Sequence, residues 1–336
     1  FHEYISKKNS ILKRYAELLR MISIQQFSSS SLQAINRRAQ EAASEVEKLA
    51  SLVNALDARA NSMMNLLVNS TLLYDLQCVY RLEKWKADHA VQLEQWLKIV
   101  TDVEVLCTLG TFAFNHPSFV YPEIENGDLR MKAIALGHPL IHEQERVHND
   151  VLLGEDQRIH IITGANMAGK STYLRTIGVN LVLAYAGLPV CAQSFQCSLL
   201  ELRSGMRASD SLKDHHSYFY AELDRLKSIM DELRSGKPLL ILLDEMLKGT
   251  NSNDKLAGSI ALVKQLLPHR CLAMVATHDL ALGKLATTHP DIIRNFCFEA
   301  LIENDQLSFD YKLKSGLAQN LNATFLMRKM GIIPAT

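Results

Sequence analysis

Residues 158–172 read RIHIITGANMAGKST, and this stretch decides the fold of the C-terminal half. An apolar run (Arg158 to Thr163) leads into the pattern G-x-x-x-x-G-K-S (Gly164 to Ser171), after which helical spacing begins. A strand followed by this pattern and a helix is the context of a phosphate-binding loop. Glycines let successive N–H groups converge on phosphate oxygens, and the helix N-terminus attracts the anion. We expect Lys170 to neutralise the β- and γ-phosphates and Ser171 to ligate Mg²⁺.

A second apolar run, Pro238 to Glu245 (PLLILLDE), ends in two carboxylates. A buried strand of this kind delivers Asp244 to the shell of the Mg²⁺ ion. Glu245, the next residue, is suited to act as the general base that polarises the attacking water. The sequence therefore predicts a nucleotide-hydrolysing site rather than a phosphate-binding turn alone.

Two further elements follow in order. The polar turn Gly249 to Asp254 (GTNSND) precedes a helix expected from Lys255, and the next strand, Cys271 to His278, ends in a histidine that can reach the γ-phosphate region. This order is typical of the ABC-type ATPase superfamily, whereas kinases and small GTPases lack it. The segment LSGGQ is absent, which weakens a transporter interpretation, and residues 209–230 take the signature position. In ABC-type enzymes the serine equivalent to Ser217 acts across a dimer interface.

The fold class predicted for residues 126–336 is an α/β P-loop NTPase domain, because buried parallel strands alternate with helices there. Turn residues between Pro117 and Gly127 mark the boundary. Residues 1–125 are expected to form an all-α helical domain. Apolar residues there follow helical spacing from Tyr4 to Ile22, a heptad-like seam from Val46 to Leu67, and a third helical stretch from Leu72 to Trp96.

Composition limits the function classes. The 336 residues carry 36 basic and 36 acidic side chains, so binding to nucleic acid would need a local patch, a dimer groove or a segment outside this chain. The six cysteines form no C-x-x-C pair and indicate reduced thiols in a cytoplasmic protein. The uncharged run Thr176 to Leu200 predicts a buried helix and strand rather than a membrane span. The first residue is Phe1 rather than Met, so we expect a fragment, with membrane tethering through a preceding region left open.

Several motifs resemble the MutS family of DNA mismatch-repair ATPases. They are ITGANMAGKSTYLRTIG at the phosphate loop, SYFYAEL (Ser217 to Leu223), LDEMLKGTNSND, ATHD (Ala276 to Asp279) and GHPLI (Gly137 to Ile141). The resemblance covers about residues 126–336, and the helical half is more loosely similar to the family's core and lever helices. Ala165, Ala168 and Lys248 depart from the usual Pro, Gly and Arg.

The resemblance implies a role for each matching residue. Glu245, His278 and Ser217 would be catalytic, with Ser217 acting in trans, and Ser171 and Asp244 would hold Mg²⁺. ATP would be bound by Gly164, Asn166, Met167, Gly169, Lys170, Ser171 and Thr172. Asn149, Asp150 and Val151 lie where the family packs a residue against adenine, and Val151 is the expected contact. The implied partners are a second copy of the chain, joined through the ATPase domains, double-stranded DNA that is mismatched or branched, and downstream repair proteins.

An alternative stays open. An ABC-type ATPase could instead drive a protein or membrane partner through a preceding N-terminal region, without mismatch recognition. A soluble P-loop kinase is disfavoured by Glu245, the polar turn and His278.

Overall fold

The computed structural model describes residues 2–57, 73–154, 156–165, 167–206, 218–247, 249–303 and 306–319. The chain divides into two compact units, Phe1–Phe112 and Ala113–Thr336. The sequence boundary, expected after Glu125, lies further along the chain than this division. Strand β1 (Glu123–Glu125) pairs with a strand of the second unit, which places these residues in that unit.

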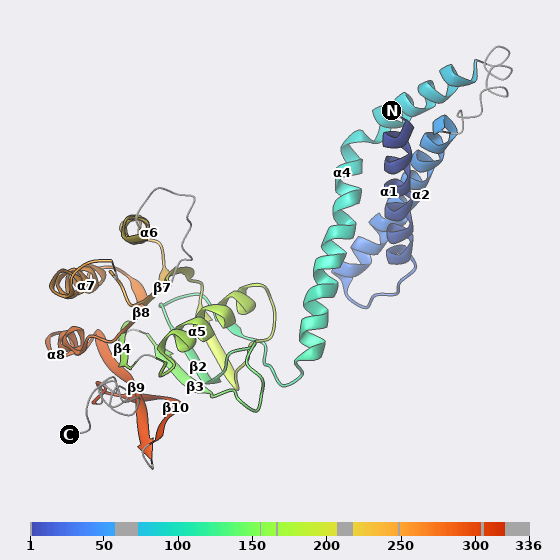
Figure 1. Ribbon diagram of the computed structural model, residues 1–336. Helices are drawn as coiled ribbons and strands as arrows, with labels where there is room; N and C mark the ends of the chain where they lie inside the picture. Colours follow the sequence, from blue (N-terminus) through green and yellow to red (C-terminus); the bar gives the residue numbers. More distant parts are fainter. Residues whose placement is uncertain are drawn as a thin grey trace. The chain divides into compact units, whose positions relative to one another are not determined.

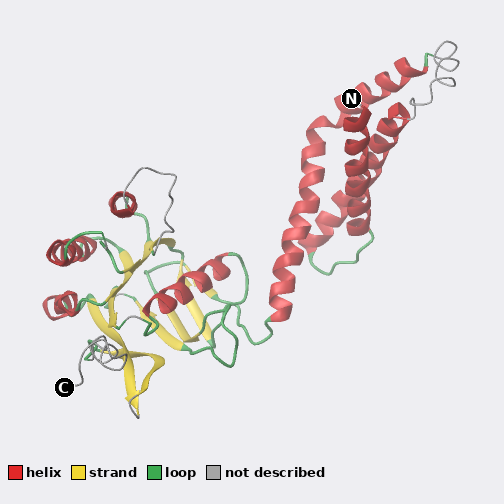
Figure 2. Ribbon diagram, viewed as in Figure 1, coloured by secondary structure: helices red, strands yellow, loops and turns green. Residues whose placement is uncertain are grey.

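The described part of the first unit is helical (Figure 2). Its helices are α1 (His2–Ser23), α2 (Ser30–Asp57) and α4 (Tyr74–Asn115). The buried core contains Ile22 and Val46, which lie at the expected apolar spacing, together with Leu19, Ala42 and Ile99, which do not belong to the expected pattern. The third helix is longer than expected and continues past Trp96 to Asn115. The later seam positions Ala60, Met63 and Leu67 lie outside the described residues.

A tilted aromatic cluster joins α2 and α4. His89 lies between Trp85 and Trp96, with ring centroids 5.3 and 5.5 Å away, and its Nε2 is 3.3 Å from Oε2 of Glu45 on α2. The tryptophans therefore serve as helix-packing residues.

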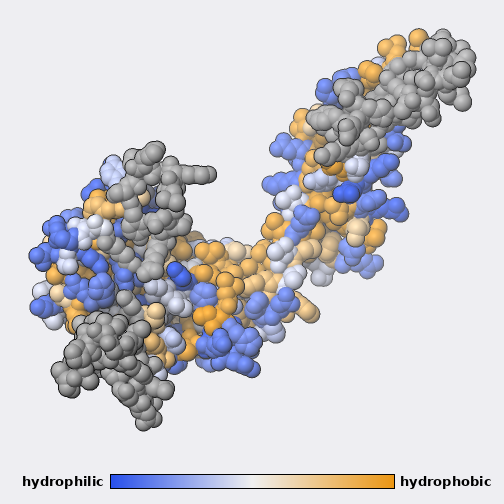
Figure 3. Space-filling view, viewed as in Figure 1, coloured by the Kyte–Doolittle hydropathy of each residue, from blue (hydrophilic) through white to orange (hydrophobic). Residues whose placement is uncertain are grey.

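The surface of this unit is mixed, with hydrophilic and hydrophobic residues interspersed over the face that Figure 3 shows.

The second unit is built on a six-stranded sheet in the order β10-β9-β4-β8-β7-β6 (Figure 1). Its strands are β4 (Ile159–Gly164), β6 (Glu201–Gly205), β7 (Leu239–Asp244), β8 (Cys271–Thr277), β9 (Ile293–Glu303) and β10 (Gln306–Ser315). The three strands predicted from apolar runs, β4, β7 and β8, are fully buried and parallel neighbours, as expected. Among the strands of this sheet that the structure describes, β10 alone runs antiparallel to its neighbour.

A second, four-stranded sheet has the order β1-β5-β2-β3. It contains β2 (Met131–Leu136), β3 (Asn149–Leu153) and β5 (Ser194–Ser198). Helix α5 (Lys170–Tyr185) and β5 make up most of the long uncharged run, which is thus a buried helix followed by a buried strand. Within the described residues, no helix is both long and apolar enough to cross a membrane.

Alternate residues of the main-sheet strands face two cores. Leu240 and Leu242 of β7 pack with α5 and the small sheet, whereas Leu239, Ile241 and Leu243 pack against the other helices. Those helices are α6 (Tyr218–Arg234), α7 (Ser252–Leu266), the 3₁₀ helix η2 (Leu280–Lys284) and α8 (Leu285–Thr288). Helix α7 begins before the expected Lys255 because the Asn251 side chain caps it, accepting a hydrogen bond from the Asp254 N–H.

His160 on β4 is a buried histidine that carries a pH prediction. The residue is 1% exposed, its ring lies 4.6 Å from that of Phe296, and neither ring nitrogen has a hydrogen-bond partner among the described residues. Burial, followed by the nearby charge of Arg294, lowers the pKa of His160 to about 3. The imidazole is therefore neutral in the folded protein at pH 5, where an exposed histidine is charged.

We expect the folded state to weaken in acid because the unfolded chain takes up this proton first. Above pH 6.5, the protonation of His160 does not reduce the free energy of unfolding. Below pH 6.5, this free energy falls by about 1.4 kcal/mol per pH unit as the pH is lowered towards 3, which gives a loss of about 2 kcal/mol between pH 6.5 and 5. Urea unfolding followed by circular dichroism measures it. His160→Leu should flatten this dependence, whereas His142→Leu, at an exposed position, should preserve it. An unchanged slope in His160→Leu would contradict the assignment.

Candidate functional site

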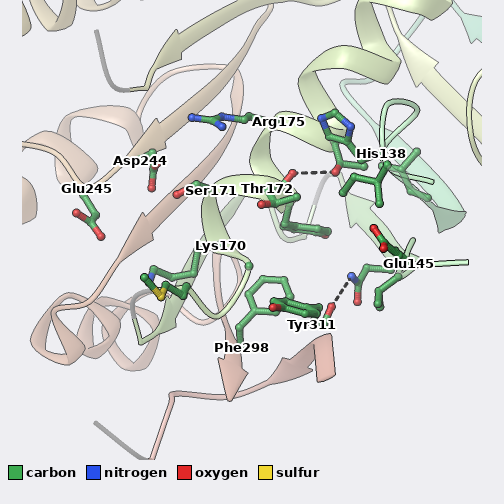
Figure 4. Close-up of a pocket in the computed structure, with 18 residues that line it drawn as sticks. His138, Glu145, Lys170, Ser171, Thr172, Arg175, Asp244, Glu245, Phe298 and Tyr311 are labelled. Atoms are coloured by element: carbon green, nitrogen blue, oxygen red, sulfur yellow. Dashed lines mark hydrogen bonds between the residues drawn. The ribbon is translucent and has the colours of Figure 1, made fainter. Parts of the chain in front are cut away.

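The carboxyl ends of β4, β7 and β8 meet at one edge of the main sheet because these strands are parallel neighbours. A cavity of about 670 Å³ lies at this edge (Figure 4). Its wall includes Lys170, Ser171 and Thr172 at the start of α5, and Asp244 and Glu245 at the end of β7. The structure thus brings together the two motifs that the sequence predicted to share a site.

The glycines of the phosphate loop are required by backbone geometry. Gly164 has φ 147°, and a β-carbon at this position would lie 2.4 Å from the carbonyl oxygen of Phe298 on the adjacent strand β9. Gly169, with φ 109°, caps the N-terminus of α5. Met167 also has positive φ, at 69°, and its side chain is 86% exposed in the cavity wall. The loop therefore has the left-handed curl that converging N–H groups need.

Lys170 is the buried cation of the loop. Its Nζ donates hydrogen bonds to the carbonyl oxygens of Gly164 (2.7 Å) and Ala165 (2.8 Å), and the residue is 4% exposed. The ammonium group is therefore held under the loop, close to the place where the loop N–H groups would receive phosphate.

Asp244 has the environment of a carboxylate that serves a cation. It is 6% exposed, and its Oδ1 is buried with no hydrogen-bond partner among the described residues. A buried carboxylate oxygen is costly unless something compensates it. Mg²⁺ is commonly held by one or two carboxylates together with phosphate and water. The donor set of Asp244 and the Ser171 hydroxyl, which line the same cavity, fits that ion.

Glu245 follows Asp244 at the end of β7 and lies near His278. The distance from Glu245 Oε1 to His278 Nδ1 is 3.9 Å, and the side chains are 16% and 49% exposed. Glu245 has φ 51° and Leu247 has φ 59°, so the turn after β7 holds two residues in the left-handed region. Each such residue costs about 1–2 kcal/mol, and surrounding contacts must therefore fix this turn.

An aromatic wall closes the cavity on the side of β9 and β10. Phe298 and Tyr311 line it, and the Tyr311 ring would lie 3.1 Å from a β-carbon placed on Gly169. The β9–β10 register shifts between Phe309 and Leu313, which releases Tyr311 from the ladder. The Asn149 side chain holds this irregular segment of β10: it donates a hydrogen bond to the Tyr311 carbonyl (3.0 Å) and accepts one from the Leu313 N–H (2.8 Å).

The sequence pattern does not group Tyr311 and Phe298 with Asn149, because the three residues lie on separate strands, although the resemblance places Asn149 near the adenine position. It also missed His138, Glu145 and Arg175, which line the same cavity (Figure 4). Burial, together with the charges of Arg175 and Arg146, lowers the pKa of His138. The GHPLI motif around His138 was the available signal.

Other expected site residues lie elsewhere. Val151 is 2% exposed and packs in the core around α5, so the structure does not bring it to the cavity; Val147 and Asn149 line the wall instead. Asn166 and Ser217 lie outside the described residues.

The sequence is also similar to proteins of a known family. The sequence model of MutS domain V matches residues 160–334. The chain is similar to the DNA mismatch repair protein MutS of Thermotoga neapolitana (28% identity; 67% of this chain and 28% of the relative). It is also similar to that of Orientia tsutsugamushi strain Ikeda (34% identity; 64% and 25%) and to DNA mismatch repair protein MutS 2 of Halobacterium salinarum (29% identity; 73% and 28%). The matched part is about a quarter of the length of these relatives.

Proposed function

The chain belongs to the MutS family, and on this premise we propose that it is a Mg²⁺-dependent ATPase that works as a dimer on mismatched or branched double-stranded DNA. The observation that carries the proposal is the single cavity lined by Lys170, Ser171, Asp244 and Glu245. A phosphate loop facing a buried carboxylate and a second, adjacent carboxylate is the arrangement that hydrolysis of a nucleoside triphosphate needs.

The proposed binding mode follows the length of the cavity. The triphosphate lies along the loop, where the N-terminus of α5 and Lys170 offset its charge. Ser171 and Asp244 would hold Mg²⁺, which would supply positive charge to offset the negative charge of the triphosphate. Adenine packs against the exposed ring of Tyr311, whose backbone Asn149 holds from β3.

Hydrolysis is assigned to Glu245 acting as a general base. Its carboxylate accepts a proton from a water molecule as that water attacks the γ-phosphorus, and the bond to the bridging oxygen of ADP breaks. His278, close to Glu245, orients this water or contacts the γ-phosphate. Met167 and Thr172 line the same cavity, where they would border the bound phosphates.

The proposals that the chain dimerises and acts on DNA are based on its family membership. Ser217, from a second copy of the chain, would complete each site, and the relatives' names supply DNA mismatch repair as the process. We propose that the helical unit serves as the core and lever that transmits ATP-driven changes to DNA. Downstream repair proteins would then recognise the ATP-bound state.

A combined assay tests this function. We expect the full-length protein to hydrolyse ATP with Mg²⁺ and to bind mismatched or branched duplex in a gel shift that weakens as salt is raised, because phosphate contacts release counterions. Plain duplex serves as the matched control. ATP hydrolysis without salt-dependent binding to any of these duplexes would exclude the DNA role and favour an ABC-type motor acting on a protein or membrane partner.

A further inference from the structure

The turn that follows β7 is fixed by contacts with other elements of the fold. Glu245 and Leu247 have φ 51° and 59°, and the side chains of Met246 and Leu247 are 4% and 8% exposed. The Glu245 N–H donates to the Ala276 carbonyl of β8 (2.8 Å), which fixes the start of the turn. The end of the turn needs a different partner because it has left the sheet.

That partner is Glu222 on α6. Its Oε1 accepts a hydrogen bond from the Leu247 N–H at 2.7 Å. Its Oε2 is buried and has no hydrogen-bond partner among the described residues. A carboxylate in such surroundings is committed to the one backbone donor it contacts.

Packing around this bond is tight. Phe219, Glu222 and Leu226 share one face of α6 by helical spacing, and Phe219 and Leu226 pack in the core beneath the turn. A β-carbon on Gly249 would lie 2.7 Å from Phe219, and one on Gly258 would lie 2.5 Å from the Leu247 side chain. Helices α6 and α7 therefore enclose the turn from two sides.

We propose that Glu222 is a positioning residue for ATP hydrolysis. Its carboxylate holds the left-handed turn that presents Glu245 to the cavity, and it thereby links the position of α6 to the general base. This inference rests on the proposed ATPase function. A shift of α6 that lengthens this hydrogen bond releases the backbone at Leu247, so hydrolysis depends on where α6 lies.

The test separates positioning from folding and from ATP binding. We expect Glu222→Ala to lower kcat by about tenfold, since it removes a hydrogen bond to a charged acceptor, while the Kd for ATP changes by less than about twofold. Glu222→Gln should restore kcat to near the wild-type value because its amide oxygen still accepts from Leu247. Glu222→Asp, one methylene shorter, should behave like Glu222→Ala. Asp224→Ala, exposed on the same helix, is the matched control and should leave kcat unchanged.

Thermal unfolding of each variant keeps the comparison valid, and if Glu222→Ala does not fold, the Asp and Gln variants decide. Wild-type kcat in Glu222→Asp, or equally low kcat in Glu222→Gln and Glu222→Asp, would overturn the inference. Hydrolysis that Glu245→Gln abolishes, but that Glu222→Ala leaves intact, would refute the inference while preserving the proposed function. Absence of Glu245-dependent hydrolysis in the wild type would overturn both.

Discussion

Glu245→Gln is expected to lower the rate of ATP hydrolysis by about two to four orders of magnitude, the usual contribution of a positioned general base. ATP affinity should stay close to that of the wild type. The amide has nearly the same size and shape as the carboxylate, but it cannot accept the proton of the attacking water. Single-turnover hydrolysis and equilibrium binding of ATP measure the two quantities separately.

The local structure supports a clean substitution at this position. The backbone of Glu245 is fixed by its hydrogen bond to Ala276 and by the left-handed φ, and neither feature depends on the charge of the side chain. The matched control is Glu123→Gln on β1, where the new amide oxygen can still accept the hydrogen bond from Gln196. Hydrolysis in Glu245→Gln at a rate close to that of Glu123→Gln would show that another group is the base.

The same variant reports on assembly. If a second copy of the chain completes each site, ATP held without hydrolysis should keep the two copies together. Light scattering of Glu245→Gln with ATP and Mg²⁺ should then show more dimer than with ADP. A monomer under both conditions would count against the dimer interface.

The site elements that the sequence predicted are those formed by one continuous stretch of residues. Strand β4 and the loop from Gly164 to Ser171 form one stretch, so the apolar run and the glycine spacing predict both the strand and its turn. The run that ends at Asp244 is similar, and its uniform burial follows from its position between β8 and β6 with a core on each face of the sheet. Parallel pairing then places both ends at one edge.

The site elements that the sequence did not predict depend on pairing between distant segments. Tyr311 reaches the cavity because the β9–β10 ladder shifts register and Asn149 of β3 holds the released backbone. The Glu222 contact to Leu247 similarly depends on how α6 packs beneath the turn. Local periodicity carries no record of either contact. Val151, which the resemblance places at the adenine site, packs in the core two residues away from Asn149.

Lys170→Ala is expected to weaken ATP binding by about 100-fold or more. A buried ammonium that hydrogen-bonds phosphate contributes about 3 kcal/mol, and each 1.4 kcal/mol corresponds to a factor of ten in Kd. The loss should be in affinity itself, because Lys170 compensates phosphate charge before any bond is broken. Titration with a fluorescent ATP analogue, competed by ATP, measures it.

Two comparisons separate the loss of the ammonium group from the loss of the buried aliphatic stem. Lys170 also donates to the carbonyls of Gly164 and Ala165, so removing its side chain takes two hydrogen bonds from the loop. Lys170→Met retains most of the buried aliphatic stem but carries no charge, and it should bind ATP as weakly as Lys170→Ala. Lys264→Ala, exposed on α7 and outside the cavity, should bind like the wild type. If Lys170→Met bound ATP with wild-type affinity, the ammonium would not be the group that receives the phosphates, and the assignment of a phosphate-binding loop would fail.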